Sequence, residues 1–171
     1  MTTKVLIADD NANNMRLLTD IIRDEGYDVY QANDGPSVIS AVYKAKPDII
    51  LLDIMMPGMD GFEVCKSLKS IYEAKDIPVI MVTAKTDSID IKKALELGAF
   101  DYIKKPVDEG EVIARLQSAL RFKQYQDKLK DMATKDSLTG IYNHGLLIEL
   151  FEREFAKNTR SGGCIAFVMV D

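Results

Sequence analysis

The chain has 171 residues, a length that suits one domain, or one domain plus part of another. Its content of 47% hydrophobic and 29% charged residues is typical of a globular protein. Its formal net charge of −5 argues against a nucleic-acid-binding surface, because contacts with phosphates require clustered lysine and arginine. The apolar runs are far shorter than the roughly 18 residues of a membrane span, and the amino terminus lacks a signal peptide's apolar segment. We therefore expect a cytoplasmic protein that binds neither nucleic acid nor a membrane.

Strand-like and helical segments alternate along about the first 120 residues. The strand-like segments, in chain order, are residues 4–8, 27–32, 49–53, 77–83 and 101–103. Segments with apolar residues three and four positions apart follow each of them, and begin near residues 13, 35, 62, 88 and 108. Five strands alternating with five helices predict a doubly wound α/β domain, in which helices cover both faces of a parallel sheet.

Turn and cap residues indicate where these helices begin and end. Asn13 and Asn14 are placed to cap the first helix, and Gly26 is placed to end it in the left-handed conformation. Asp108, with Glu111 three positions later, resembles a capping box at the start of the fifth helix. The helical boundaries thus agree with the apolar pattern.

Chemically active side chains lie at or just after the ends of four of the five predicted strands: Asp9 and Asp10, Asp53, Thr83 and Lys105. The carboxyl ends of parallel strands meet at one edge of a sheet, so these side chains should lie close together. Three carboxylates at one point repel one another unless a cation lies among them, and Mg²⁺ suits such oxygen ligands. A hydroxyl and an ammonium beside the metal would serve phosphoryl transfer, with an aspartate as the acceptor.

Each of these residues, taken singly, also has a simpler interpretation. Asp9 or Asp10 could cap the following helix, Thr83 could be a turn residue, and Lys105 could be solvated. Their joint occurrence at successive strand ends favours the phosphoryl-acceptor interpretation.

Four stretches resemble the receiver domain of bacterial two-component response regulators: Asp9-Asp10 and residues 51–61, 82–84 and 104–106. The resemblance covers residues 4 to about 120. It implies a flavodoxin-like sheet with the strand order 2-1-3-4-5. It also implies a histidine kinase or a phosphotransfer protein as the phosphoryl donor.

The resemblance assigns the acceptor and the metal ligands residue by residue. It implies that Asp53 takes the phosphoryl group from a phosphohistidine. Asp9 and Asp10 would bind Mg²⁺ together with Asp53, and Met55 would contribute its backbone carbonyl.

The resemblance also assigns the residues that sense the phosphoryl group. Thr83, with the neighbouring Ala84, and Lys105 would contact the phosphoryl oxygens. Tyr102 would be the aromatic switch residue whose rotamer reports phosphorylation.

The fifth helix continues beyond the predicted sheet and carries a second apolar stripe. Residues 113–120 form a first stripe that should pack on the sheet, whereas Phe122, Tyr125, Leu129 and Met132 form a second stripe offset by two residues. The second stripe has a heptad-like spacing, which favours a coiled-coil homodimer controlled by phosphorylation. The alternative is a solvated linker helix.

Residues 133–143 resemble the entry segment of GGDEF, or diguanylate cyclase, domains, usually close to A-x-x-D-x-L-T-G-L-x-N. The resemblance places the family's first metal-binding aspartate at Asp171. The Gly-Gly-Asp/Glu-Glu-Phe loop that names the family is absent from this sequence. We therefore expect a fragment of a longer regulator, in which GTP and cyclase activity belong only to the complete parent. The expected parts are a receiver domain at 1–121, a linker helix at 122–135 and a truncated GGDEF domain at 136–171.

Two other functions are compatible with the same residues. A Mg²⁺-dependent small-molecule phosphatase or phosphotransferase could use Asp53 as its nucleophile, and would show turnover. Haloacid-dehalogenase-type phosphatases have a second aspartate two positions on, where this chain has Met55. An interaction module that binds Mg²⁺ without being phosphorylated is the other alternative.

Overall fold

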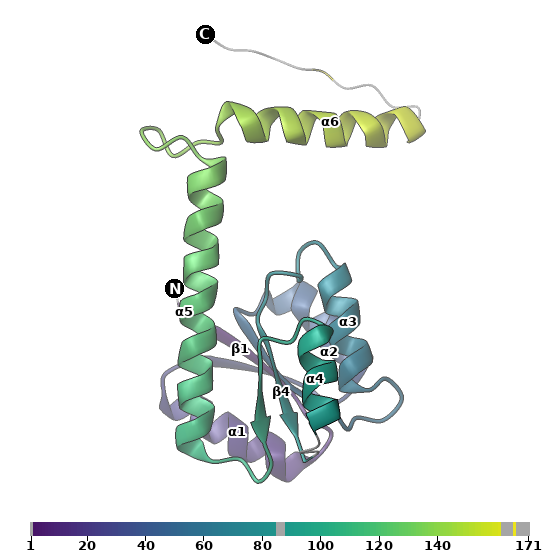
Figure 1. Cartoon of the computed structure of the whole chain (residues 1–171), viewed down its shortest axis with the longest axis vertical. Coiled ribbons are helices and arrows are strands. Elements are labelled where there is room, and N and C mark those ends of the chain that lie inside the picture. The colour runs from purple at the N-terminus through teal and green to yellow at the C-terminus, as the bar shows by residue number, and fades with distance from the viewer. Residues whose placement is uncertain (1, 85–87, 162–165, 167–171) are drawn as a thin grey trace. The chain divides into compact units, whose positions relative to one another are not determined.

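The structure is a computed structural model that describes residues 2–84, 88–161 and 166. The chain divides into two compact units, Met1–Gln124 and Tyr125–Asp171. The first unit is an α/β domain (Figure 1). Within the described ranges, no helix has both the length and the apolar character needed to cross a membrane.

Five parallel strands form the sheet of the first unit, in the order β2-β1-β3-β4-β5. This order confirms the doubly wound, flavodoxin-like fold expected from the sequence. The strands are β1 (Lys4–Ala8), β2 (Asp28–Ala32), β3 (Ile49–Asp53), β4 (Val79–Thr83) and β5 (Asp101–Lys104).

Six helices occur among the described residues. Five belong to the predicted alternation with strands, and the fifth of these runs on into the second unit. The sixth follows the GGDEF-like stretch at residues 133–143. The helices are α1 (Ala12–Asp24), α2 (Gly35–Ala45), α3 (Gly61–Ser70), α4 (Ser88–Glu96), α5 (Glu109–Thr134) and α6 (His144–Ser161).

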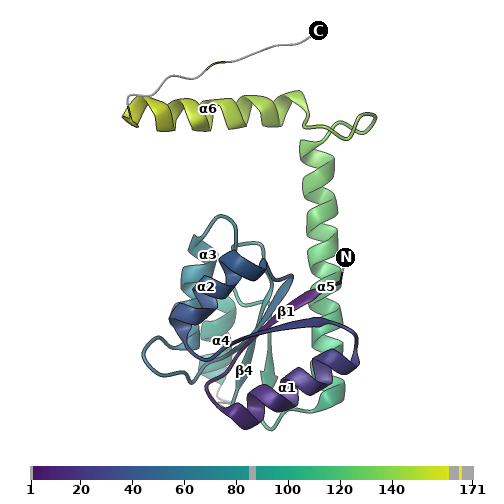
Figure 2. The ribbon, with the colours of Figure 1, turned by 180° about the vertical axis from the view of Figure 1, so that it is seen from behind.

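Two apolar cores lie on opposite faces of the sheet. Helices α2, α3 and α4 pack on one face, whereas α1 and α5 pack on the other (Figures 1 and 2). The central strands β3 and β4 are buried at every residue. Covering on both faces explains why Ile49 to Leu52 is an unbroken apolar run. These strands hold the backbone firmly at the edge where Asp53 and Thr83 lie.

The amino-terminal cap of α1 corrects one sequence prediction. Asn11, rather than Asn13 or Asn14, is the cap: its Oδ1 accepts hydrogen bonds from the backbone N–H groups of Asn13 and Asn14 at 2.9 and 3.3 Å. A cap precedes the first helical turn, because the first N–H groups of a helix lack intrahelical partners. Asn13 and Asn14 therefore lie inside the helix.

Aspartates cap three further helices. Asp34 and Asp60 form capping boxes at α2 and α3. Asp108 accepts a hydrogen bond from the backbone N–H of Glu111 at 2.9 Å, as predicted. The Glu111 side chain instead forms an ion pair with Arg115 at 3.4 Å. The start of α5 is thus fixed by one half of the expected capping box.

Hydrogen bonds within the second unit define the loop between α5 and α6. Asp136 Oδ1 accepts hydrogen bonds from the backbone N–H and the hydroxyl of Thr139, at 2.9 and 2.8 Å. The Asn143 amide donates to the carbonyl of Ala133 at 2.8 Å and accepts from the N–H of Leu146 at 3.0 Å. The loop is therefore held by side chains of its own segment.

Candidate functional site

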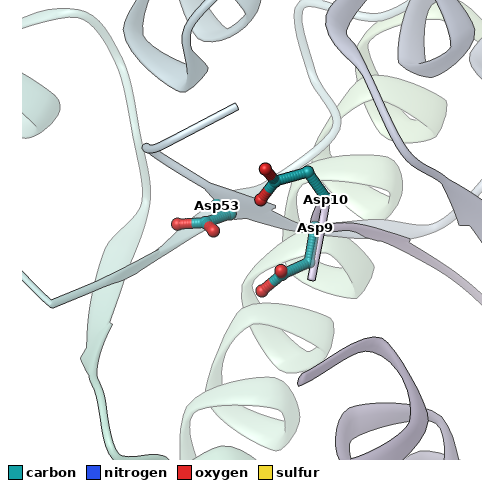
Figure 3. Close-up of side chains that lie close together, drawn as sticks. All are labelled: Asp9, Asp10 and Asp53. Atoms are coloured by element: carbon teal, nitrogen blue, oxygen red, sulfur yellow. The ribbon is translucent and has the colours of Figure 1, made fainter. Parts of the chain in front are cut away.

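Three carboxylates meet at the carboxyl edge of the sheet, where β1 and β3 end side by side. Asp53 is the last residue of β3, and Asp9 and Asp10 follow β1. One carboxylate oxygen of each residue lies within 4.8 Å of the other two (Figure 3). Asp9 and Asp53 are buried, with 1% and 3% of their surface exposed, whereas Asp10 is exposed. The sheet thus brings together the three acids that the sequence analysis grouped.

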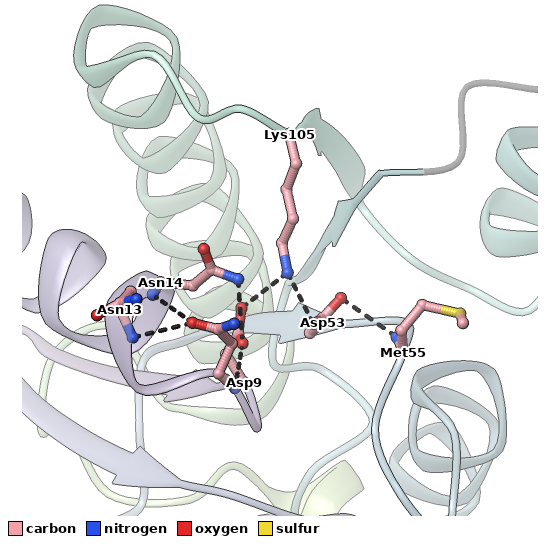
Figure 4. Close-up of polar contacts among 7 residues, drawn as sticks. Asp9, Asn13, Asn14, Asp53, Met55 and Lys105 are labelled. Atoms are coloured by element: carbon pink, nitrogen blue, oxygen red, sulfur yellow. Dashed lines mark hydrogen bonds and ion pairs between the residues drawn. The ribbon is translucent and has the colours of Figure 1, made fainter.

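The ammonium of Lys105 joins two of these acids. Its Nζ donates hydrogen bonds to Asp9 Oδ2 at 2.9 Å and to Asp53 Oδ2 at 2.7 Å (Figure 4). The Lys105 side chain is only 17% exposed. Because Lys105 directly follows β5, the parallel topology carries this cation to the same edge as the acids.

The remaining oxygens of the buried acids accept hydrogen bonds from nearby donors. Asp9 Oδ1 accepts from the backbone N–H of Asn11 at 2.8 Å and from the Asn14 amide at 3.4 Å. Asp53 Oδ1 accepts from the backbone N–H of Met55 at 3.2 Å. No sequence pattern predicted the contacts of Asn11 and Asn14 with Asp9. Their position within five residues of Asp9 was the only signal for them.

The loop after β3 folds back tightly over the strand end. The N–H of Gly61 donates to the carbonyl of Ile54 at 3.0 Å. A Cβ atom at Gly61 would collide with the backbone carbonyl of Asp53 and lie 2.8 Å from the Ile54 Cα. Gly58 has a φ of +79°, a backbone conformation that residues other than glycine rarely adopt. Both glycines are therefore needed to bring this loop beside Asp53.

Burial and charge act in opposite directions on the ionisation of the site. Burial raises the pKa of the Asp53 carboxyl above its ordinary value, although the hydrogen bond and the charge of Lys105 partly offset this effect. Burial by itself would lower the pKa of the Lys105 ammonium. Its hydrogen bonds to Asp53 and Asp9, together with the negative charges of these two carboxylates, outweigh burial and raise that pKa. Lys105 is therefore a permanent cation at neutral pH.

The other predicted residues lie on the neighbouring strands. Thr83 ends β4 and is buried, and Ala84 follows it as an exposed residue. Tyr102 lies on β5 opposite Met81, is partly buried, and packs against the core that faces α2, α3 and α4. Asp171, expected as an output-domain metal ligand, lies outside the described residues.

The oxygen donors at this edge suit a hard divalent cation. The cluster offers carboxylate oxygens and no sulfur or imidazole ligand, which favours Mg²⁺ over zinc or copper. Burial of Asp9 and Asp53 increases the need for a positive partner, because two desolvated carboxylates repel each other. The residues present therefore fit the metal that the strand-end pattern predicted.

Comparisons with known proteins agree with this geometry. Residues 5–117 match the family model of the response regulator receiver domain. The chain belongs to this family. The structure resembles the Vibrio cholerae chemotaxis protein CheY4 with a TM-score of 0.68 and 30% identity, over 70% of this chain and 100% of that chain.

Two further receiver domains have similar structures. The signal receiver domain of a signal transduction histidine kinase from Syntrophus aciditrophicus gives a TM-score of 0.65 and 30% identity, over 70% of this chain and 91% of that chain. A CheY-like receiver domain protein from Methanospirillum hungatei JF-1 gives a TM-score of 0.69, over 74% of this chain and 99% of that chain. Its identity of 24% shows only that the fold is shared.

Proposed function

We propose that Asp53 is the phosphoryl acceptor of this receiver domain, with a histidine kinase or a phosphotransfer protein as the donor. The observation that carries the proposal is the Lys105 ammonium, 2.7 Å from Asp53 and 2.9 Å from Asp9, the two buried acids of the site. A cation held between two carboxylates is placed to pair with the negative oxygens of a transferring phosphoryl group.

In this reaction a carboxylate oxygen of Asp53 attacks the phosphorus of a phosphohistidine. The O–P bond forms as the N–P bond breaks, and the imidazole leaves with the electron pair of that bond. Lys105 turns from Asp53 toward the phosphoryl oxygens, and Thr83 with the Ala84 backbone contacts another of them. Bound Mg²⁺ would neutralise negative charge on the phosphoryl oxygens.

The metal ligands proposed for Mg²⁺ are Asp9, Asp10, Asp53 and the backbone carbonyl of Met55. The support is the 4.8 Å grouping of the three carboxylates, together with the loop that places Met55 next to Asp53. Asp10 is exposed, so it can reach a hydrated ion at the surface of the site.

We further propose that phosphorylation acts through Thr83 and Tyr102 on α5, and promotes a homodimer. Support comes from the second stripe of that helix, whose side chains are exposed: Phe122 by 43%, Tyr125 by 65%, Leu129 by 66% and Met132 by 78%. Exposed apolar side chains at heptad-like spacing are typical of a helix that pairs with another.

For the output we propose the start of a GGDEF domain at 136–171, after the receiver at 1–121 and the linker helix at 122–135. In the complete parent, Asp171 would bind a metal, and two cyclase domains would each hold GTP. The supporting observation is that the border between the compact units, at Gln124 and Tyr125, falls within the proposed linker.

Acetyl phosphate with Mg²⁺ tests the central proposal. We expect one phosphoryl group on each wild-type chain and none on Asp53→Asn, measured by intact-protein mass spectrometry and phosphate-affinity gels. The matched control is Asp20→Asn, because Asp20 is an exposed aspartate of α1 that should leave labelling unchanged. Equal labelling of Asp53→Asn, or no labelling of the wild type, would refute the acceptor role. Steady release of phosphate from a small phosphoester would instead favour the phosphatase.

A second measurement tests the proposed dimer. Light scattering after beryllofluoride and Mg²⁺ should show a larger mass for the wild type than for Leu129→Asp, whose new charge opposes apolar packing. An equal response of the two proteins would exclude the second stripe as the dimer contact.

A further inference from the structure

A charged cluster lies beside Tyr102, away from the acidic site. The guanidinium of Arg115, on α5, is 2.7 Å from Asp101 Oδ2 and 3.4 Å from Glu111 Oε1. It also lies 5.8 Å from the centre of the Tyr102 ring. One side chain of α5 therefore contacts the residue preceding Tyr102 and faces the aromatic ring itself.

Asp101 connects this cluster to the backbone of the edge strand. Its Oδ1 accepts a hydrogen bond from the backbone N–H of Tyr102 at 2.8 Å, while its Oδ2 accepts from Arg115. The strand β5 is the last of the sheet, and an N–H group on a free edge needs such a partner. The Asp101 carboxylate thus joins the Tyr102 backbone to α5.

The guanidinium is well suited to hold an aromatic ring in place. Its planar fork binds carboxylates with directional hydrogen bonds, and a cation within about 6 Å of a ring centre is attracted to the ring face. Glu111 lies one turn before Arg115 and supports the guanidinium from its other side. The Arg115 side chain is 38% exposed, so these contacts can be exchanged without unfolding the core.

We propose that Arg115 is a positioning residue for Tyr102, which fixes the orientation of the ring and couples it to α5. The inference rests on the proposed switch role of Tyr102 for its signalling consequence, but the positioning itself concerns the unphosphorylated protein. Rotation of Tyr102 would break the contact with the guanidinium and loosen the join between β5 and α5. The same helix continues to Thr134, so Arg115 and the second stripe belong to one continuous helix along which a change at Arg115 can be transmitted.

Fluorine NMR of the unphosphorylated chain labelled with 3-fluorotyrosine tests the positioning. The chain has seven tyrosines, and the resonance that disappears in Tyr102→Phe identifies Tyr102. In Arg115→Ala this resonance should move by more than its own linewidth, because the ring loses the cation that faces it. Arg121→Ala is the matched control, since Arg121 is an exposed arginine of the same helix, and it should leave the resonance in place.

Two milder variants keep the test valid if Arg115→Ala folds poorly. Arg115→Lys keeps a cation near the ring but loses the planar fork, so we expect a smaller shift in the same direction. Asp101→Asn retains an oxygen for the Tyr102 N–H and removes the charge that holds Arg115, so it should also shift the resonance. An unmoved resonance in folded Arg115→Ala and Asp101→Asn, or an equal shift in Arg121→Ala, would overturn the proposal.

Hydrogen exchange tests the coupling to α5 once Asp53 carries a phosphoryl group. Arg115→Ala should be labelled by acetyl phosphate to the wild-type extent, but lose the phosphorylation-dependent change in amide exchange along α5. A full wild-type change in Arg115→Ala would overturn the coupling. Failure of wild-type labelling would refute the acceptor role of Asp53, and the NMR result would still decide whether Arg115 positions Tyr102.

Discussion

The two units of the chain differ in the burial of their apolar and polar side chains. In the first unit two clusters of apolar side chains are buried on the two faces of the sheet, and Asp9, Asp53 and Thr83 are buried at its edge. In the second unit no residue from 125 to 156 is buried. Ten large apolar side chains there are exposed, from Tyr125 to Phe155.

This difference shows what holds each region in shape. A doubly covered sheet can position charged groups at its edge, because a close-packed core on both faces holds the strand ends in place. The second unit instead has helical hydrogen bonds and the side-chain contacts of Asp136 and Asn143. Such local bonds define a conformation but contribute little stability without packing. Its exposed apolar surface is therefore the part of the molecule with most to gain from a partner.

The largest expected difference comes from equal truncations in the two regions. Ile80→Ala should lower the free energy of unfolding by about 2–5 kcal/mol, because Ile80 is fully buried and its loss leaves a cavity. Leu129→Ala, at 66% exposure, should change it by less than about 0.5 kcal/mol at concentrations where the chain is monomeric. Urea titrations followed by circular dichroism measure both values. Similar costs would mean that the stripe is packed within the monomer.

The next largest difference in stability is expected when the lysine is removed from each of two ion pairs of the same length. Lys105–Asp9 and Lys135–Asp131 both span 2.9 Å, but the first is mostly buried and the second is half exposed. Lys105→Ala should cost about 3 kcal/mol, because it leaves two buried carboxylates without a cation. Lys135→Ala should cost at most about 1 kcal/mol. Thermal unfolding measures both changes.

Added Mg²⁺ sharpens this comparison of ion pairs. A bound cation should restore stability to Lys105→Ala, because it takes over the neutralisation of the carboxylates and binds only the folded state. Lys135→Ala keeps the three acids of the site, so Mg²⁺ should stabilise it only to the wild-type extent, and less than Lys105→Ala. A Lys105→Ala protein that is insensitive to Mg²⁺ would contradict the proposed metal site.

A smaller effect concerns the pH dependence of the first unit. Burial raises the pKa of Asp53 above 3.8, so the folded state binds more protons than the unfolded state between 3.8 and the raised pKa. Stability therefore falls as pH rises through this window, and the ionised Asp53 is a cost at neutral pH. Without Mg²⁺, Asp53→Asn should raise the Tm by roughly 2–4 °C at pH 7. The advantage should shrink as the pH is lowered through the Asp53 pKa, and a constant difference would contradict this explanation.

The smallest effect has the opposite sign and lies in the second unit. Hydrogen bonds from Thr139 and Leu138 lower the pKa of Asp136 below 3.8. Its stabilisation is therefore present above pH 3.8 and is lost as the pH falls through the lowered pKa. Asp136→Ala should speed amide exchange at Thr139 and leave the unfolding transition of the first unit unchanged. Slow exchange in the variant would show that the loop does not depend on this carboxylate.

Local sequence patterns predicted the alternation of strands and helices and the grouping of the acidic site, whereas the strand order followed from the resemblance to receiver domains. The apolar run before Asp53 and the repeated placement of reactive residues after strands predicted which side chains would meet, because parallel topology brings strand ends to one edge. The caps were less predictable: Asn11, Asn13 and Asn14 have similar propensities, and only the helix geometry selects Asn11. The contact of Asn14 with Asp9 follows from that selection.

By itself, the sequence determined the order of elements, the buried strands and the identity of the charged residues at their ends, since these depend on short-range periodicity. Only the tertiary structure decided which oxygen faces which donor: Lys105 between Asp9 and Asp53, and Arg115 between Asp101 and Glu111. Lys105 is 96 residues from Asp9 along the chain, so no local pattern contains that contact. Burial then sets the strength of the ion pair between Lys105 and Asp9, because the same two charges interact weakly in water and strongly inside a packed domain.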